Sequence, residues 1–391
     1  MIICIGEALI DMVQAPVSGS GHGFFPLPGG SPYNTAIALG KMKVPVKFLG
    51  KFSTDFFGEI LVKRLIDNNV GDDLIIRSNL NSTLSFVKLE KGKEPQYVFY
   101  TEETADRSLD IGDLPDKLPP ETKCILFGSI AMTMEPLASA IDALILREAT
   151  RKNAIPQKSS KSQDSGAHGT KATAQDPMDI APVISFDPNI RPFMIKDKAA
   201  FIVRFEKWAS SSTIAKISLA DFEYLYPKLE PEKALMKILA MGPRLAICTM
   251  GKKGALAYLR RNDGSITKVS APVVDLPVID TIGAGDTFHG AFISWLERRD
   301  KMSRTGLANL EEKDLYDALY FANKAASIVC TRRGAEPPTL REVERLKAPD
   351  VKTSVKASAK ASTKTSEKSS TKTSGKPKAP VNPIKKTAAK K

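Results

Sequence analysis

The chain of 391 residues carries a net charge of +13, from 57 Lys and Arg against 44 Asp and Glu, and 42% of its residues are apolar. This apolar content excludes disorder of the whole chain, and the length suffices for one large α/β domain or two smaller ones. The charge is uneven, because residues 351–391 hold 12 lysines and one acid, a net charge of +11. The first 350 residues are nearly neutral, so the basic composition does not indicate that they bind a polyanion.

The four cysteines lie far apart, without the CxxC or Cys/His clusters of metal and redox sites. We expect them to be buried thiols in a reducing compartment. The first residues lack the basic stretch and cleavage site of a signal peptide, and no segment reaches the roughly 18 apolar residues of a membrane span. We therefore expect a soluble cytoplasmic protein that does not contact a membrane.

Short apolar runs alternate along the chain with longer stretches of helical periodicity. This alternation predicts an α/β fold with a mostly parallel central sheet flanked by helices. In such folds, ligands bind beyond the carboxyl ends of the strands, so the segments that follow the strands should form one rim. The predicted strands are residues 1–5, 44–49, 124–127, 183–186, 215–217 and 245–249, and the predicted rim segments are 6–11, 128–129, 187–191, 218–221 and 250–254.

Three regions depart from this pattern. Residues 84–89 and 96–100 alternate apolar and polar side chains around the turn KGKEP, which predicts a β-hairpin lid at about 82–104. Residues 156–182 have no periodicity and predict a disordered insertion. From residue 349 the chain is rich in Lys, Ser, Thr and Ala, which indicates a disordered tail after a domain spanning residues 1–348.

The motif DTIGAGDTFHGAF (280–292) carries the clearest chemistry. Apolar residues beyond its Gly-Ala-Gly turn follow helical spacing, so Asp286 should lie in the first turn of a helix. The free N–H groups and the dipole of such a helix favour an anion, and the glycines allow the backbone to approach it closely. A carboxylate beside this anion site is placed to take a proton from an attacking hydroxyl. A glycine turn with an acidic helix start explains the spacing equally well.

A second motif, GGSPYN (29–34), precedes an apolar helix. Ser31 suits the N-cap, Pro32 the first helical position and Gly40 the helix end. The glycine pair permits a ligand to approach the backbone, and Asn34 offers a donor and an acceptor to sugar hydroxyls. A loop and a cap without any ligand remain the alternative.

The two motifs together resemble the signatures of the ribokinase-like (PfkB) family of sugar kinases. GGSPYNTAIALGKMKVPVKFLGKFSTDFFG (29–58) is similar to the N-terminal signature and DTIGAGDTFHGAF to the C-terminal one, about 250 residues apart. The resemblance covers residue 1 to about 345, apart from the insertion. It implies a ribokinase-like fold with Asp286 as catalytic base and Gly283, Ala284 and Gly285 as the anion hole.

On the sugar side, the resemblance implies that Asp11, Gly30 and Asn34 bind sugar hydroxyls. TADR (104–107) and DPNIR (187–191) are similar to segments of the fructokinase branch, in which the arginine matching Arg191 helps to hold the substrate. The implied activity is transfer of a phosphoryl group from ATP to fructose, which yields fructose 6-phosphate and ADP. A turn acid at position 11 and a surface arginine at position 191 are the alternatives.

On the nucleotide side, TMGKKG (249–254) resembles the loop after the nucleotide-domain strand, which implies ATP contacts from Thr249, Gly251 and Gly254. Asn323, with residues 334 and 335, resembles the adenine-pocket segment. Where many relatives have Asn-x-x-Glu for arranging Mg²⁺ and phosphate, this chain has Ser218 and Asp221, so Asp221 is expected to act on Mg²⁺ through water. A glycine turn between two strands would explain the first segment without a nucleotide.

Several alternatives remain open. The chain has no P-loop motif, and His289, one turn after Asp286, is a rival base that we expect to be packed or solvated instead. A 2-keto-3-deoxygluconate kinase of the same family is the nearest enzymatic alternative. A non-enzymatic protein that binds nucleic acid through its basic tail is an alternative of another class, and weak polyanion binding by the tail is expected in either case. The oligomeric state stays open between a monomer and a homodimer.

Overall fold

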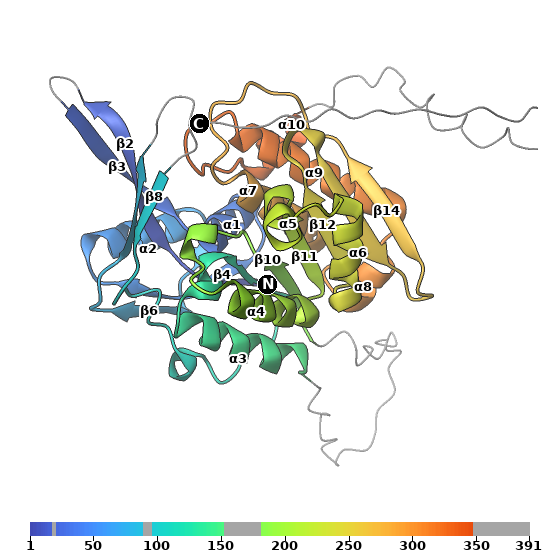
Figure 1. Cartoon of the computed structure of the whole chain (residues 1–391), viewed down its shortest axis with the longest axis horizontal. Coiled ribbons are helices and arrows are strands. Elements are labelled where there is room, and N and C mark those ends of the chain that lie inside the picture. Colours follow the sequence, from blue (N-terminus) through green and yellow to red (C-terminus); the bar gives the residue numbers. More distant parts are fainter. Residues whose placement is uncertain (18–20, 89–95, 152–180, 347–391) are drawn as a thin grey trace, which may run out of the picture. The chain divides into compact units, whose positions relative to one another are not determined.

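A parallel sheet forms the centre of the molecule (Figure 1). The computed structural model describes residues 1–17, 21–88, 96–151 and 181–346. Within these residues, ten strands form one sheet, in the order β14-β13-β12-β11-β10-β9-β1-β4-β5, with β6 beside β4. Only the pairs β12/β13 and β13/β14 are antiparallel in this described sheet. The strands are β1 (Ile2–Ile5), β4 (Val46–Ser53), β5 (Val70–Gly71), β6 (Ile75–Ser78), β9 (Cys124–Gly128), β10 (Val183–Asp187), β11 (Ile214–Ser218), β12 (Leu245–Thr249), β13 (Ala255–Arg260) and β14 (Ile266–Ala271).

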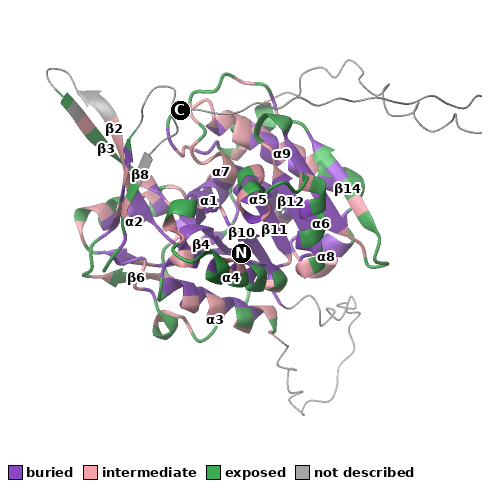
Figure 2. Ribbon diagram, viewed as in Figure 1, coloured by how far each residue is buried: buried purple, intermediate pink, exposed green. Residues whose placement is uncertain are grey.

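Helices cover both faces of this sheet because its strands are apolar on both sides. Alternate residues of β1 enter different cores: Ile2 and Cys4 pack with α1, α2, α7 and α9, whereas Ile3 and Ile5 pack with α3 to α6. The burial pattern of Figure 2 accordingly places most buried residues on the sheet and on the inward faces of the helices. The helices are α1 (Ser31–Lys41), α2 (Phe56–Asp67), α3 (Leu137–Ala149), α4 (Lys198–Ser211), α5 (Leu219–Leu225), α6 (Pro231–Met241), α7 (Ala284–Arg298), α8 (Arg304–Ala308), α9 (Glu312–Val329) and α10 (Leu340–Arg345).

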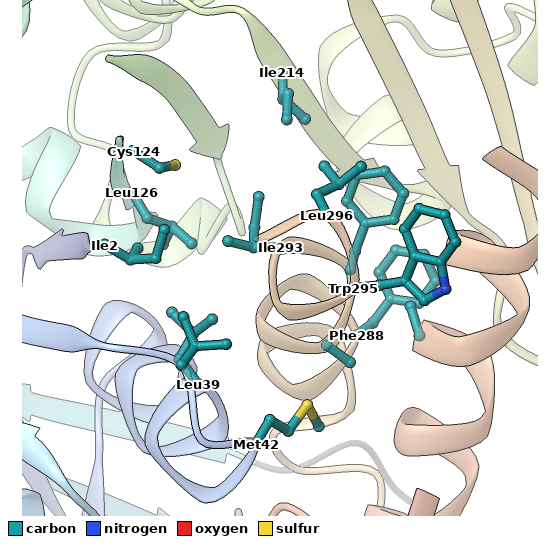
Figure 3. Packing of buried hydrophobic residues seen from close by; sticks show 14 of the residues in the cluster. Ile2, Leu39, Met42, Cys124, Leu126, Ile214, Phe288, Ile293, Trp295 and Leu296 are labelled. Carbon is teal, nitrogen blue, oxygen red and sulfur yellow. The ribbon is translucent and has the colours of Figure 1, made fainter. Parts of the chain in front are cut away.

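Helix α7 is buried along most of its length. Every residue from Asp286 to Leu296 is buried, and Figure 3 shows Phe288, Ile293, Trp295 and Leu296 packed among side chains of α1 and the sheet. The helix that we predicted after the Gly-Ala-Gly turn is therefore confirmed, and Asp286 lies in its first turn. Because the helix is packed against its neighbours along this length, its N-terminus is held in place at the carboxyl ends of the strands.

A second sheet contains four strands in the order β3-β2-β7-β8 within the described residues. The antiparallel pairing of β7 (Thr83–Lys88) and β8 (Gln96–Tyr100) confirms the predicted hairpin, with Leu84 opposite Tyr100. The prediction of a hairpin alone was wrong, because β2 (Leu9–Val17) and β3 (Gly21–Gly29) extend it. Residues 6–11 are therefore not simply a rim segment, since Leu9 already begins a strand. The missed strands carry Pro16, Pro26 and Pro28, which are depleted in strands generally.

The six predicted strands are all present, with ends that differ by a few residues. The predicted insertion (156–182) and tail (349–391) lie outside the described residues, apart from positions 181 and 182. Cys4, Cys124 and Cys248 are buried free thiols as expected, and Cys330 is partly exposed. In the part of the chain that the structure describes, no helix is both long and apolar enough to cross a membrane.

Candidate active site

Two side chains of α1 hold the carboxylate of Asp286 from both sides. The Ser31 hydroxyl donates to Asp286 Oδ1 at 2.6 Å, and the Asn34 amide donates to Asp286 Oδ2 at 2.9 Å. The Thr35 hydroxyl adds a longer contact to the backbone carbonyl of Asp286 at 3.4 Å. The carboxylate has room for about four acceptor contacts, so it keeps lone pairs for a ligand. The structure thus brings the predicted base and the predicted sugar ligand Asn34 into direct contact.

The approach of α1 to α7 depends on small residues. A Cβ atom at Gly290 would lie 2.8 Å from Ala38 Cβ, so these two positions keep the helices close together. The predicted caps of α1 were wrong in detail: Gly30 is the N-cap residue, without a side-chain cap, and the helix runs past Gly40 to Lys41. The Ser31 hydroxyl is not a cap because it turns toward Asp286 across the helix interface.

Burial dominates the electrostatics of Asp286. It raises the pKa of the carboxyl above its usual value, and the hydrogen bonds from Ser31 and Asn34 oppose this rise. Among charged neighbours, Asp187 raises the pKa and Lys216 lowers it. A carboxylate with a raised pKa is, once ionised, a stronger base than an exposed aspartate.

The N-terminus of α7 begins at a backbone conformation that glycine provides. Gly283 has φ 74°, in the left-handed region, and a Cβ atom there would lie 2.6 Å from Ala335 Cβ. Asp280 links the two segments, because its carboxylate accepts hydrogen bonds from the backbone N–H groups of Ile282 and Gly334. The predicted anion hole and the segment around residue 334 therefore form one structural unit.

Asp11 lies in β2, facing Ser85 of the neighbouring strand β7. The Ser85 hydroxyl donates to Asp11 Oδ1 at 2.6 Å, and Asp11 Oδ2 lies against Gly29. Burial raises the pKa of Asp11 to about 6, while Ser85 and the positive charge of Arg191 lower it and Asp286 raises it further. The prediction that position 11 follows a strand in a loop was wrong, but Arg191 and Asp286 both lie close enough to Asp11 for their charges to act on it.

Arg191 is held by its own segment. Its guanidinium donates to the side-chain oxygen of Asn189 at 2.8 Å and to the carbonyl oxygens of Asn189 and Ile190 at 3.2 Å. These contacts come from one guanidinium nitrogen, so other donors of the group remain for a ligand. Gly30, with φ 106°, lies against the carbonyl oxygen of Glu7.

Glu7 is a buried carboxyl that the sequence did not single out. It accepts hydrogen bonds from the backbone N–H groups of Ser31 at 3.0 Å and Ala131 at 3.4 Å. Burial raises the pKa of Glu7 to about 7, and a hydrogen bond from Ser129 opposes the rise. Since Glu7 and Ser129 follow the adjacent strands β1 and β9, where strand order reverses, they mark the topological switch point of the sheet. Glu7 therefore holds the start of α1 through its hydrogen bond with the backbone N–H of Ser31.

The predicted nucleotide residues gather around the end of β14. Thr249 ends β12, and Gly251 begins a short 3-10 turn that returns the chain to β13. Gly254 lies against the carbonyl oxygen of Ala271, and the Asn323 amide donates to the carbonyl oxygens of Ala271 and Pro272 at 2.9 and 3.0 Å. The loop around Gly254 and helix α9 therefore both contact the end of β14. The amide of Asn323 is already hydrogen-bonded to backbone carbonyl groups there.

Asp221 is buried in the first turn of α5. Its Oδ1 accepts a hydrogen bond from Ile190 N at 2.7 Å, and its Oδ2 accepts bonds from the backbone and hydroxyl of Ser218. In the described part of the chain, no group of three His, Cys, Asp or Glu side chains is arranged to hold a metal ion.

A buried polar cluster beneath the site was also missed. Lys216 Nζ donates to Asp187 Oδ2 at 2.7 Å, and both side chains are almost fully buried. His289 Nε2 and the Ser185 hydroxyl are hydrogen-bonded at 2.7 Å, and burial holds the pKa of His289 well below its usual value. His289 is thus packed and neutral, as expected. A lysine inside the apolar strand sequence IAKIS was the available signal for this cluster.

The sequence of this chain is similar to those of known carbohydrate kinases. The model of the pfkB family carbohydrate kinases matches residues 1–152 and 159–341. A fructokinase of Rhizobium leguminosarum bv. trifolii is 33% identical over 315 residues, which cover 81% of this chain and 85% of the relative.

Two solved structures share the fold. A fructokinase from Xylella fastidiosa with bound ATP superposes with a TM-score of 0.72 at 24% identity, covering 88% of this chain and 96% of that one. A fructokinase from Vibrio cholerae O395, in a form with fructose, ADP and calcium ion bound, gives a TM-score of 0.65 at 22% identity, covering 85% of this chain and 94% of that one. The predicted ribokinase-like α/β fold is confirmed by this similarity.

Proposed function

Because the chain belongs to the PfkB family of carbohydrate kinases, we propose that it is a fructokinase, with Asp286 as the catalytic base. Membership of the family makes the chain a phosphotransferase that acts on a sugar hydroxyl. The choice of fructose is supported by the fructokinase of Rhizobium and by the Vibrio fructokinase, which was solved with fructose and ADP bound. The roles of individual residues are supported by the geometry of Asp286, a buried carboxylate held from two sides at the start of α7.

In the proposed reaction, Asp286 accepts the proton of the primary hydroxyl of fructose. The hydroxyl oxygen forms a bond to the γ-phosphorus of ATP while the bond from that phosphorus to the ADP oxygen breaks. The products are fructose 6-phosphate, ADP and one proton, which Asp286 afterwards releases to solvent. General base catalysis of this kind contributes about 10²- to 10⁴-fold to the rate.

The backbone of Gly283, Ala284 and Gly285 would stabilise the charge on the transferred phosphoryl group. These residues stand at the beginning of α7, where the first N–H groups have no acceptor within the helix and the helix dipole is positive. The Ala284 N–H donates to the carbonyl oxygen of Thr281 at 3.2 Å. Since the helix is buried along most of its length, these donors do not have to reorient during the reaction, which makes their stabilisation of the transition state effective.

The sugar would lie between the second sheet and the start of α1. Asp11 and Asn34 offer acceptor and donor groups for hydroxyls, Gly30 allows close approach of the sugar to the backbone, and Arg191 adds a charged donor. The electrostatic coupling of Asp11 to both Arg191 and Asp286 supports this grouping. The hairpin β7–β8 is proposed as the lid that excludes water, a competing phosphoryl acceptor.

ATP would bind at the end of β14, near Thr249, Gly251, Gly254 and Asn323, with its phosphates directed toward α7. Mg²⁺, when bound with ATP, neutralises phosphate charge, and Asp221 would orient its water ligands. The buried free thiols Cys4, Cys124 and Cys248 support a cytoplasmic location, where thiols stay reduced.

The experiment that tests the proposed function is coupled ADP release from the full chain with Mg-ATP and one sugar at a time. The panel contains fructose, ribose, 2-keto-3-deoxygluconate and adenosine. We expect the highest kcat/KM with fructose. A preference for 2-keto-3-deoxygluconate would replace the fructokinase assignment by the kinase of that acid sugar, and activity with none of the four would contradict the assignment of a sugar substrate from this panel.

A further inference from the structure

Lys216 is a charged side chain in the middle of the buried strand β11. It is 3% exposed, and Asp187 on the neighbouring strand β10 accepts its hydrogen bond at 2.7 Å. Burial lowers the pKa of Lys216 and is the largest single effect, but the charge and hydrogen bond of Asp187 together with the charges of Asp221 and Asp286 outweigh it, so the pKa lies above its usual value. The side chain is therefore an ammonium ion inside the protein, where a charge acts more strongly than in water.

The ammonium lies next to the backbone of Gly285. A Cβ atom built at Gly285 would be 3.1 Å from Lys216 Nζ, which is the only atom within 4 Å of that position among the described residues outside the adjoining residues and backbone of α7 itself. Any larger residue at 285 would press on the ammonium. Glycine at this position thus keeps a positive charge beside the backbone that the proposed function uses as the anion hole.

Lys216 also balances an excess of negative charge. Asp187, Asp221 and Asp286 all act on its charge, so three carboxyl groups face one ammonium. His289, 3.8 Å from Asp187, does not help because burial and the charge of Lys216 keep it neutral. The ammonium has three N–H donors, and Asp187 is its one acceptor within the described residues.

We propose that Lys216 supplies a fixed positive charge to the transferring phosphoryl group, and that Asp187 positions it. The inference rests on the proposed function, since it takes Gly283–Gly285 as the anion hole. A loose phosphoryl-transfer transition state spreads negative charge over three oxygens, and a charge already in place stabilises it without reorganisation. Lys216 assists the backbone donors electrostatically, and Asp286 remains the base.

The test compares the wild type with Lys216→Met, which keeps the length of the side chain and removes its charge. We expect kcat to fall about 10²- to 10³-fold, with KM for fructose within about threefold of the wild type. Lys207→Met is the matched control, because it removes a lysine paired with Asp142 at 2.9 Å on the surface of α4. Its kcat should equal that of the wild type.

A transition-state mimic separates this role from a structural one. ADP with aluminium fluoride, in the presence of fructose, imitates the transferring phosphoryl group. In Lys216→Met, we expect the affinity for this complex to fall by the same factor as kcat, while the affinity for ADP alone changes less than threefold. If both affinities fall together, Lys216 only maintains the fold of the site and the proposal is overturned.

A double variant covers the outcome in which Lys216→Met does not fold. Removing Lys216 alone leaves Asp187 as a buried charge without its partner, whereas Lys216→Met with Asp187→Asn removes both members of this pair. The double variant should fold and keep the low kcat of the single change. Recovery of wild-type kcat would overturn the proposal. A failure of the proposed function would instead appear in the wild type, as absence of fructose-dependent ADP release.

Discussion

Ser31 and Asp286 are 255 positions apart in sequence, and the Ser31 hydroxyl donates to Asp286 Oδ1 at 2.6 Å. The contact joins the start of α1 to the start of α7, and the backbone of Ser31 is in turn anchored on Glu7. This hydroxyl and the Asn34 amide together connect the N-terminal signature to the proposed base. Both hydrogen bonds lower the pKa of Asp286 and so oppose the effect of burial.

Ser31→Ala should shift the pH dependence of the reaction. A hydrogen bond to the ionised carboxylate lowers its pKa, so loss of the Ser31 hydroxyl raises the pKa of Asp286, which burial and Asp187 already raise. The base works only when ionised, so the acid limb of the kcat/KM profile should move to higher pH. At neutral pH we expect kcat to fall about tenfold, the size of a charged hydrogen bond.

Ser212→Ala is the control for this change. Ser212 is also buried and donates a bond of 2.6 Å, but to the backbone of Trp208, far along α4. Ser212→Ala should leave the acid limb of the kcat/KM profile at the same pH as in the wild type. An unshifted acid limb in Ser31→Ala would show that the Ser31 hydroxyl does not tune the base.

Fructose binding should weaken as pH falls through about 6, because Asp11 becomes protonated there. Its raised pKa comes from burial, and the protonated form loses the negative charge that the sugar hydroxyls would meet. Calorimetric titration with fructose in the presence of ADP measures the affinity for fructose. No turnover occurs under these conditions, so an effect of Asp286 protonation on the rate does not enter the measurement. Asp11→Asn should bind fructose about 10- to 100-fold more weakly, with little dependence on pH between 5 and 7. Binding that is independent of pH in the wild type would contradict a role for Asp11.

Gly283→Ala should damage both stability and activity. The residue would need a left-handed conformation, and its Cβ atom would collide with Ala335 Cβ. We expect the free energy of unfolding to fall by about 1–3 kcal/mol and kcat to fall with it, as measured by denaturant titration and ADP release. Gly264→Ala is a matched control, because Gly264 also has a positive φ of 84° but has no atom within 4 Å of its Cβ position. Gly264→Ala should lower the free energy of unfolding and leave kcat unchanged. Equal kcat values in the two variants would contradict a role of the start of α7 in the reaction.

A chain ending at residue 348 should keep kcat and KM within about twofold, since the sequence places 11 of the 13 net charges after residue 350. The same change should abolish any weak binding to a DNA oligonucleotide at low salt, because such binding depends on phosphate contacts by lysine. Steady-state kinetics and fluorescence anisotropy measure the two effects. Loss of turnover on truncation would contradict a catalytic domain confined to residues 1–348.

The sequence predicted those parts of the structure that depend on local pattern. Hydrophobic periodicity placed the parallel strands and the helix after Gly285, because each buried strand or helix face requires apolar side chains at fixed intervals. It missed β2 and β3, whose prolines and glycines disguise a pair of strands that is stabilised by its neighbours. Secondary structure set by tertiary contacts cannot be derived from local propensity.

The residues of the site also fall into those that the sequence predicted and those that it missed. Asp286, Asp11 and Asn34 stood in recognisable motifs, but the contact of Asn34 with Asp286 joins helices from opposite ends of the domain. Glu7 was not singled out from the sequence and is recognised by its burial, whereas the one sequence signal for Lys216 is its place in the apolar strand IAKIS. Such groups become visible when long-range packing is known.

The most direct test of the account is fructose-dependent ADP release by Asp286→Asn, which keeps the shape of the side chain and removes its basicity. We expect kcat to fall about 10²- to 10⁴-fold, with fructose still bound and the thermal unfolding transition preserved. Glu148→Gln, which alters a buried carboxyl of α3 paired with Arg147, is the control and should retain wild-type kcat. Near-wild-type turnover by Asp286→Asn would contradict the central claim that Asp286 is the base.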